Sequence, residues 1–127
     1  MDRIRVLLVD DEKELSMLMA EHLGTHGLDC EVALSGEAAL TVLEKGPPDI
    51  VILDMKMPGM GGMEVLDRVK DEYPEIPVII MTGLGSNEGE VDARRLGAFD
   101  YLRKPVNIAD LLETVRRTGL LPEMDEE

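Results

Sequence analysis

The feature that most constrains this chain is the apolar stretch at residues 50–55, in which Ile-Val-Ile-Leu leads directly to the carboxylate of Asp54. A continuous apolar run, rather than an alternating one, is typical of a strand in a parallel sheet that helices cover on both faces. Pro58 and Gly59 follow closely, so the chain has to leave the sheet there. Asp54 is therefore expected at the carboxyl-terminal edge of a strand, where open α/β folds bind their ligands.

Strand-like and helix-like segments alternate five times along the sequence, without an internal repeat or a linker. The predicted strands are residues 4–9, 28–32, 50–55, 77–82 and 100–103, and a helical pattern follows each of them. Right-handed crossovers turn such an alternation into a parallel sheet with helices on both faces. Because Asp29 and Glu31 alternate with apolar residues, residues 28–32 are typical of an edge strand. The predicted fold class is therefore α/β, a flavodoxin-like (βα)5 doubly wound parallel sheet with strand order 2-1-3-4-5.

The helical patterns carry more specific expectations. Ser35 and Asn107 precede the second and the fifth helix and are expected to be their N-caps. The first helix carries apolar residues on one stripe that is expected to face the core: Leu15, Leu18, Met19 and Leu23. The fourth helix follows a glycine-rich loop and has few apolar residues to bury, namely Val91, Ala93 and Leu96. It is therefore expected to be weakly anchored and able to move.

Length and charge restrict the class of protein further. With 127 residues the chain is expected to form one domain over residues 1–120, followed by an acidic tail at 121–127. The net charge of −14, from 27 acidic and 13 basic residues, argues against direct contact with nucleic acid, which requires clustered Lys and Arg. The sequence has no apolar stretch of membrane-spanning length, and its single cysteine, Cys30, excludes an internal disulfide. A cytoplasmic domain without membrane contact is expected.

Polar residues occur at the carboxyl ends of four of the five predicted strands. The first strand ends at Asp10 and Asp11, the third at Asp54, the fourth at Thr82 and the fifth at Lys104. Because the first and third strands are neighbours in the predicted order, the three carboxylates are expected to converge at the switch point of the sheet. Taken singly, each residue also has a purely structural interpretation: Asp11 as a helix cap, for example, and Asp54 as a turn residue. Their coincidence at one edge favours a functional site.

The charges of this group indicate what it binds. Carboxylates at 4 Å repel one another by about 4 kcal/mol per pair at an effective dielectric constant of about 20. Three carboxylates and one lysine sum to −2, which a divalent cation neutralises, and oxygen ligands suit Mg²⁺ or Mn²⁺ rather than Zn²⁺. A phosphoryl group on Asp54 would add negative charge that Lys104 and the cation oppose, while the Thr82 hydroxyl donates to a phosphoryl oxygen. The residues alone thus indicate a phosphoryl-accepting aspartate beside a divalent-cation site.

Five short motifs occur in a fixed order along the chain: VLLVDDE at residues 6–12, DIVILD at 49–54, MPGMGG at 57–62, MTG at 81–83 and GAFDYLRKP at 97–105. Each motif is short, but the ordered set is highly specific. With these motifs, and over residues 4 to about 118, the chain resembles the receiver domain of two-component response regulators.

The resemblance implies a role for each residue of the group. Asp54 corresponds to the phosphoacceptor, and Asp10 and Asp11 correspond to the acids of the Mg²⁺ site, which Asp54 completes. The main-chain carbonyl of Lys56 corresponds to a further metal ligand, and the Lys56 side chain occupies a position that modulates the loss of the phosphoryl group in the family. The remaining roles are those of the switch pair, Thr82 and Tyr101, and of the phosphate-binding lysine, Lys104, whose bond to Pro105 is expected to be cis.

The resemblance also implies a phosphorylation-controlled switch rather than an enzyme. A sensor histidine kinase or a phosphotransfer protein is the expected donor, and the domain is expected to lose the phosphoryl group by self-dephosphorylation. Phosphorylation is expected to draw Thr82 toward the phosphate and Tyr101 inward, which reshapes the surface around the fourth helix, the fifth strand and the fifth helix. That surface would then regulate a downstream protein or an output domain, or form a phosphorylation-dependent dimer.

Three alternatives remain open. An aspartate-nucleophile phosphatase usually has a second acid two residues after the nucleophile, where this chain has Lys56. An interaction module of the same fold that is never phosphorylated would bind Mg²⁺ weakly or not at all. A flavodoxin-like cofactor binder requires a phosphate-cradling loop after the first strand, where Asp10, Asp11 and Glu12 would repel a phosphate.

Overall fold

The structure, a computed structural model, describes residues 3–55, 59–83 and 87–120, with the backbone alone at residues 87–88. The acidic tail expected at 121–127 lies outside these residues. The elements, in chain order, are β1 (Ile4–Val9), α1 (Lys13–Gly24), β2 (Leu28–Ala33), α2 (Gly36–Lys45), β3 (Ile50–Asp54), α3 (Gly62–Glu72), β4 (Val78–Thr82), α4 (Asn87–Arg95), β5 (Asp100–Arg103) and α5 (Ile108–Arg117). Within the described part of the chain, no helix has the length and apolar character needed to cross a membrane.

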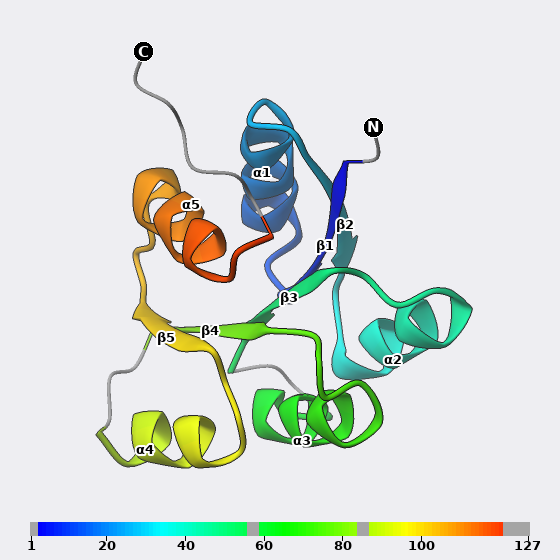
Figure 1. Ribbon diagram of the computed structural model, residues 1–127, viewed down its shortest axis with the longest axis vertical. Coiled ribbons are helices and arrows are strands. Elements are labelled where there is room, and N and C mark those ends of the chain that lie inside the picture. Colours follow the sequence, from blue (N-terminus) through cyan, green and yellow to red (C-terminus); the bar gives the residue numbers. More distant parts are fainter. Residues whose placement is uncertain (1–2, 56–58, 84–86, 121–127) are drawn as a thin grey trace.

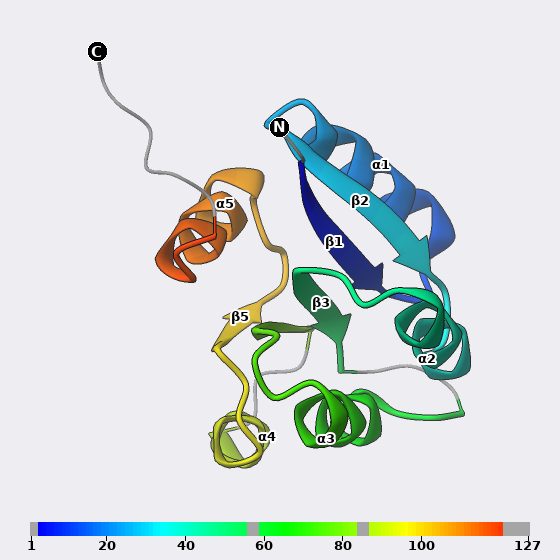
Figure 2. The same ribbon diagram turned by 45° about the vertical axis from the view of Figure 1, so that its right-hand side comes forward.

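The five strands form one parallel sheet in the order β2-β1-β3-β4-β5, which confirms the predicted fold class. Helices α1 and α5 lie on one face of the sheet and α2, α3 and α4 on the other (Figure 1), and the turned view in Figure 2 shows the same separation. Every residue of β3 and of β4 is buried, because both strands are covered from both sides. At the edge, β2 exposes Asp29 and Glu31, as its alternating sequence predicts.

The sheet separates two apolar cores. Val51 and Leu53 of β3 point into the core that α2, α3 and α4 cover, whereas Ile50 and Ile52 point into the core under α1 and α5. This alternation follows from the two-residue period of side-chain direction along a strand. The main chain of β3 thus lies between two packed layers. This packing fixes where its last residue, Asp54, lies in the molecule.

Side-chain caps start two of the helices at the predicted residues. The Ser35 hydroxyl accepts a hydrogen bond from the N–H of Ala38 at 3.0 Å, at the start of α2. The Asn107 side chain accepts from the N–H of Asp110 at 2.7 Å, at the start of α5. Each bond satisfies a backbone donor that the helix itself leaves without a partner, so both N-cap predictions are confirmed.

The predicted apolar stripe of α1 is wrong in part. Leu23 is fully buried, as predicted, but Leu15 and Leu18 are 60% and 62% exposed. Ser16 occupies the buried side of the helix instead, because its hydroxyl donates to the main-chain carbonyl one turn earlier and so needs no water. The helix is therefore rotated relative to the prediction, and it presents two leucines to the surface.

Helix α4 has the small apolar anchor that the sequence predicts. Among the side chains of the helix that the structure describes, only that of Ala93 is fully buried. Val91 is 51% exposed, and Leu96, just beyond the end of the helix, is 37% exposed. Burial of one methyl group contributes much less than burial of a leucine. That α4 moves remains a prediction.

Gly62 allows α3 to begin in direct contact with the end of β3. A Cβ atom at Gly62 would lie 2.7 Å from the Cα of Met55 and 2.8 Å from the carbonyl oxygen of Asp54, closer than atoms can approach. At the neighbouring Gly61, an added Cβ would meet no atom within 4 Å. The close approach at Gly62 therefore helps to fix the main chain of Asp54.

Gly62→Ala is expected to destabilise the domain by about 1–3 kcal/mol, because the added methyl group must displace main-chain rather than side-chain atoms. Gly61→Ala, one residue earlier, is the matched control and is expected to change the free energy of unfolding by less than about 0.5 kcal/mol. Urea denaturation of the two variants measures the difference. Equal midpoints for the two variants would contradict the close approach at Gly62.

Candidate functional site

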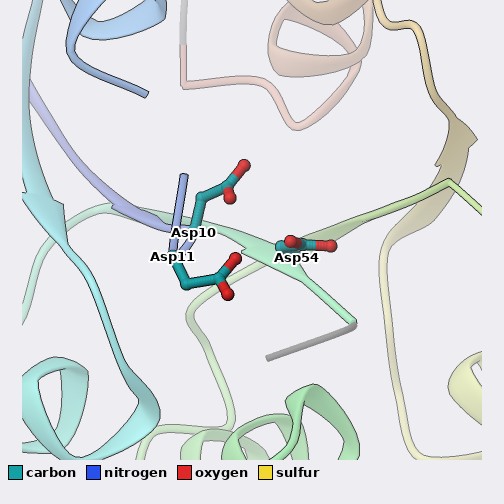
Figure 3. A group of neighbouring side chains, drawn as sticks. All are labelled: Asp10, Asp11 and Asp54. Atoms are coloured by element: carbon teal, nitrogen blue, oxygen red, sulfur yellow. The ribbon is translucent and has the colours of Figure 1, made fainter. Parts of the chain in front are cut away.

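The three predicted acids come together at the carboxyl-terminal edge of the sheet. Strands β1 and β3 pair with Val9 opposite Leu53, so Asp10 and Asp54, the next residue on each strand, lie side by side. One carboxylate oxygen from each of Asp10, Asp11 and Asp54 lies within 4.8 Å of the others. Figure 3 shows the carboxyl groups of Asp10 and Asp11, from the end of β1, close to that of Asp54, from the end of β3. We call the space between these three carboxyl groups the crevice.

The turn after β1 allows two consecutive residues to face this crevice. Two hydrogen bonds join Asp10 to main-chain groups of other residues: its N–H donates to the carbonyl of Ala33 at 3.0 Å, and its Oδ1 accepts from the N–H of Glu12 at 3.0 Å. Asp10 and Asp54 are 5% and 4% exposed, whereas Asp11 lies at the surface. The helix-cap interpretation of Asp11 is wrong, because the N-cap of α1 is Glu12, which makes no side-chain cap bond.

Lys104 bridges the two buried carboxylates. Its Nζ lies 3.3 Å from Oδ2 of Asp10 and 3.4 Å from Oδ2 of Asp54. Burial by itself lowers the pKa of Lys104, but the charges of Asp54 and Asp10 outweigh this effect and raise the pKa above its ordinary value. The ammonium group is therefore charged at neutral pH. The Lys104 N–H donates to the carbonyl of Thr82 at 2.7 Å, and the bond to Pro105 is cis, as predicted.

Thr82 and Tyr101 lie on the two strands beside the crevice. Thr82 is the last residue of β4, is 3% exposed and pairs with Arg103 of β5. Tyr101 is 8% exposed and belongs to the apolar core that also contains Ala93 of α4. The ring of Tyr101 is thus already turned inward, which the predicted inward movement did not anticipate.

One predicted residue lies outside the described part of the chain, and one residue at the site was not predicted. Lys56, expected to offer its main-chain carbonyl, lies outside the described residues. Glu12 was not predicted, yet its Oε1 lies 3.9 Å from the Nζ of Lys104. The signal for this contact was its position directly after two acids. Because the first helical pattern begins at Glu12, however, the residue was interpreted as part of that helix and not as part of the acidic group.

The side chains in the crevice fit a hard divalent cation. The donors of the cluster are three carboxylates, that is, oxygen atoms without nitrogen or sulfur, and this is the donor set of Mg²⁺. Lys104 contacts two of the three acids, and the four charges together sum to −2. A divalent cation would balance the charge that the lysine leaves uncompensated.

A doubly wound parallel sheet with buried acids and a lysine at its switch point places the chain among the α/β proteins whose ligand site lies at the carboxyl ends of the strands. Residues 6–116 match the response regulator receiver domain. The chain therefore belongs to the family of response regulator receiver domains, which are phosphorylation-controlled switches that bind Mg²⁺ through acidic residues.

Known relatives cover nearly the whole chain. It is 37% identical over 117 residues to the DNA-binding transcriptional regulator NtrC of Salmonella typhimurium, across 92% of this chain and 25% of that protein. It is 39% identical over 125 residues to the response regulator protein FleR of Pseudomonas aeruginosa, across 97% of this chain and 26% of that protein. A solved CheY-like receiver domain protein of Methanospirillum hungatei superposes with a TM-score of 0.88 at 31% identity, across 91% of this chain and 93% of that chain. The chain thus spans about a quarter of the length of these two curated relatives.

Proposed function

We propose that the domain accepts a phosphoryl group on Asp54 from a sensor histidine kinase or a phosphotransfer protein. One observation carries this proposal: Asp10, Asp11 and Asp54 converge from two strands, and Lys104 contacts two of them from a third. Asp54 is the acceptor because it ends the central strand and is held by packing on both sides. Asp10 and Asp11, with Asp54 and the Lys56 carbonyl, hold Mg²⁺, and Mn²⁺ can replace it.

The chemistry is an in-line displacement at phosphorus. A carboxylate oxygen of Asp54 forms the new P–O bond while the P–N bond to the donor histidine breaks, and the leaving imidazole takes up a proton. Lys104 stabilises the charge on the phosphoryl oxygens, and the Thr82 hydroxyl donates a hydrogen bond to one of them. The bound cation supplies additional neutralisation of the phosphoryl charge.

Loss of the phosphoryl group completes the cycle. Water attacks the phosphorus, inorganic phosphate leaves, and the Asp54 carboxylate is restored. The domain thus receives a phosphoryl group and releases it without turning over a separate substrate. Lys56, two residues after the acceptor, is proposed to set the rate of this self-dephosphorylation.

Phosphorylation changes the surface that α4, β5 and α5 form. Thr82 moves toward the phosphoryl group, and Tyr101 and the weakly anchored α4 adjust to that movement. The altered surface regulates a downstream protein or an output domain, and it can form a dimer that depends on phosphorylation. With a net charge of −14, the domain itself does not contact nucleic acid.

The test is incubation of the purified domain with a small acyl phosphate. Intact-mass measurement is expected to detect one phosphoryl group per chain in the presence of Mg²⁺ and none in the presence of EDTA. Hydroxylamine is expected to remove the group, because it cleaves acyl phosphates and leaves phosphoserine and phosphothreonine intact. Continuous release of phosphate from small esters would support an aspartate-nucleophile phosphatase instead, and absence of labelling would support a non-phosphorylated interaction module.

The effect of Asp11→Asn on the stability of the domain is expected to change sign when Mg²⁺ is added. Asp11 makes no ion pair within the described residues, so in EDTA its removal only relieves repulsion and is expected to stabilise the domain by about 0.5–1 kcal/mol. With Mg²⁺ at a hundredfold excess over its Kd, the wild type gains about 2.7 kcal/mol, and the variant is expected to gain less. Thermal melts with and without Mg²⁺ measure both effects, with Asp29→Asn on β2 as the control. Equal Mg²⁺ shifts for wild type and Asp11→Asn would contradict the assigned metal site.

A further inference from the structure

Asp100, the first residue of β5, lies between arginines from two different helices. Its Oδ1 is 3.2 Å from Nη2 of Arg94 on α4, and its Oδ2 is 2.5 Å from Nη2 of Arg117 on α5. Oδ1 also accepts a hydrogen bond from the N–H of Tyr101 at 2.8 Å. One carboxylate therefore connects two helices to the main chain of the strand between them.

The Asp100 carboxylate is largely enclosed and fully charged. Its side chain is 14% exposed. Burial by itself raises the pKa of Asp100, but hydrogen bonds from Arg117, from the Tyr101 N–H and from Arg94 together lower the pKa below its ordinary value. The contacts are thus charge-assisted hydrogen bonds at neutral pH, which are stronger than bonds between neutral groups.

This ion-pair cluster matters most for α4, because the apolar anchor of that helix is small. Ala93 is buried, but Val91 is half exposed, so little apolar area holds the described part of the helix. Arg94 follows Ala93 directly and also pairs with Glu90 at 3.0 Å, which orients the guanidinium toward Asp100. A polar contact at the last turn of α4 therefore adds to an apolar contact one residue earlier.

We propose that Asp100 is a positioning residue of the switch: by binding Arg94 and Arg117 it holds α4 in the arrangement in which the ring of Tyr101 is turned inward. This inference rests on the proposed function, in which movement of α4 and Tyr101 transmits phosphorylation. Because an inward Tyr101 is the arrangement that phosphorylation is expected to favour, the contact and the phosphoryl group favour the same arrangement. By linkage, removing the contact shifts the equilibrium away from that arrangement and makes phosphorylation of Asp54 less favourable.

The first experiment is hydrogen exchange on the unphosphorylated domain without Mg²⁺. Asp100→Asn, in which the amide oxygen still accepts from the Tyr101 N–H, is expected to exchange the α4 amides roughly two- to tenfold faster than the wild type. Amides of β1 and α1 serve as the internal reference and are expected to be unchanged. The control is Asp92→Asn, which removes an exposed partner of Arg95 on the same helix. Equal α4 exchange in wild type and Asp100→Asn would overturn the proposal, as would a uniform increase across the domain.

The second experiment measures the rate of labelling by a small acyl phosphate with Mg²⁺. Asp100→Asn and Arg94→Gln are both expected to be labelled roughly two- to tenfold more slowly than the wild type, whereas Arg95→Gln is expected to match it. Arg94 is half exposed, so its replacement tests the same contact without a risk to folding. Faster α4 exchange without slower labelling would overturn the positioning role. Absence of labelling in the wild type would instead refute the proposed function, because the exchange experiment does not depend on phosphorylation.

Discussion

Asp54→Asn is expected to abolish covalent phosphorylation by a small acyl phosphate in the presence of Mg²⁺. The amide oxygen of asparagine is a poor nucleophile, while the side chain has nearly the same size and fits the same buried position, 4% exposed at the end of β3. Asp10→Asn, which keeps the acceptor, is expected to slow labelling by about 10²–10³ rather than abolish it, because it weakens the proposed Mg²⁺ site but leaves the nucleophile in place. Intact-mass measurement over time separates the two outcomes.

Asp92→Asn is the control for this comparison. It makes the same chemical change on the exposed side of α4, far from the crevice in sequence and on a different element. Its labelling is expected to equal that of the wild type. If Asp54→Asn were labelled as fully as Asp92→Asn, the phosphoacceptor would have to be another residue, and the assignment of Asp54 would fail.

Leu53→Ala is expected to destabilise the domain by about 2–5 kcal/mol, a larger loss than that expected for Gly62→Ala. Leu53 is fully buried in the middle strand, paired with Val9 on one side and with Ile80 on the other. Removing three carbon atoms there leaves a cavity that neither neighbouring strand can fill without breaking its own packing. A loss of this size is a large fraction of the stability of a domain of ordinary size.

Leu18→Ala on α1 is the matched control, because it removes the same atoms from a side chain that is 62% exposed. It is expected to change the free energy of unfolding by less than about 0.5 kcal/mol. Urea denaturation of both variants, followed by circular dichroism, gives the two values. Similar losses for Leu53→Ala and Leu18→Ala would show that burial of the middle strand does not dominate the stability of the domain.

The fold could be predicted because the sequence of each strand indicates whether that strand is buried or lies at the edge of the sheet. Residues 50–55 are continuously apolar and become the fully buried β3, whereas Asp29 and Glu31 alternate with apolar residues and mark the edge. The strand order then places the carboxyl ends of β1 and β3 side by side, which brings Asp10 and Asp54 together. These predictions needed residue type and periodicity, which are local properties of the chain, and the general rules for connecting parallel strands.

Two features that depend on particular side-chain hydrogen bonds or ion pairs were missed. The rotation of α1 depends on Ser16, whose burial is possible because its hydroxyl bonds to the helix main chain; no apolar period reveals this. The contact of Asp100 with Arg117 joins residues with no helical or strand spacing between them. The periodicity of apolar residues indicates neither contact, and the contact of Asp100 with Arg117 forms only after β5 and α5 have packed together.

The division of the interior into two cores has a consequence for how the family can diversify. Because β3 sends alternate side chains to opposite layers, a volume change under α1 and α5 is insulated by the sheet from the layer that contains Tyr101 and Ala93. Substitutions that adapt one layer to a new neighbour can then accumulate while the opposite layer keeps its ancestral packing. Asp100 is an exception, since it bonds to arginines of α4 and α5 at once. We therefore expect substitutions at Asp100, Arg94 and Arg117 to be coupled. The apolar layers on either side of these residues are expected to change independently.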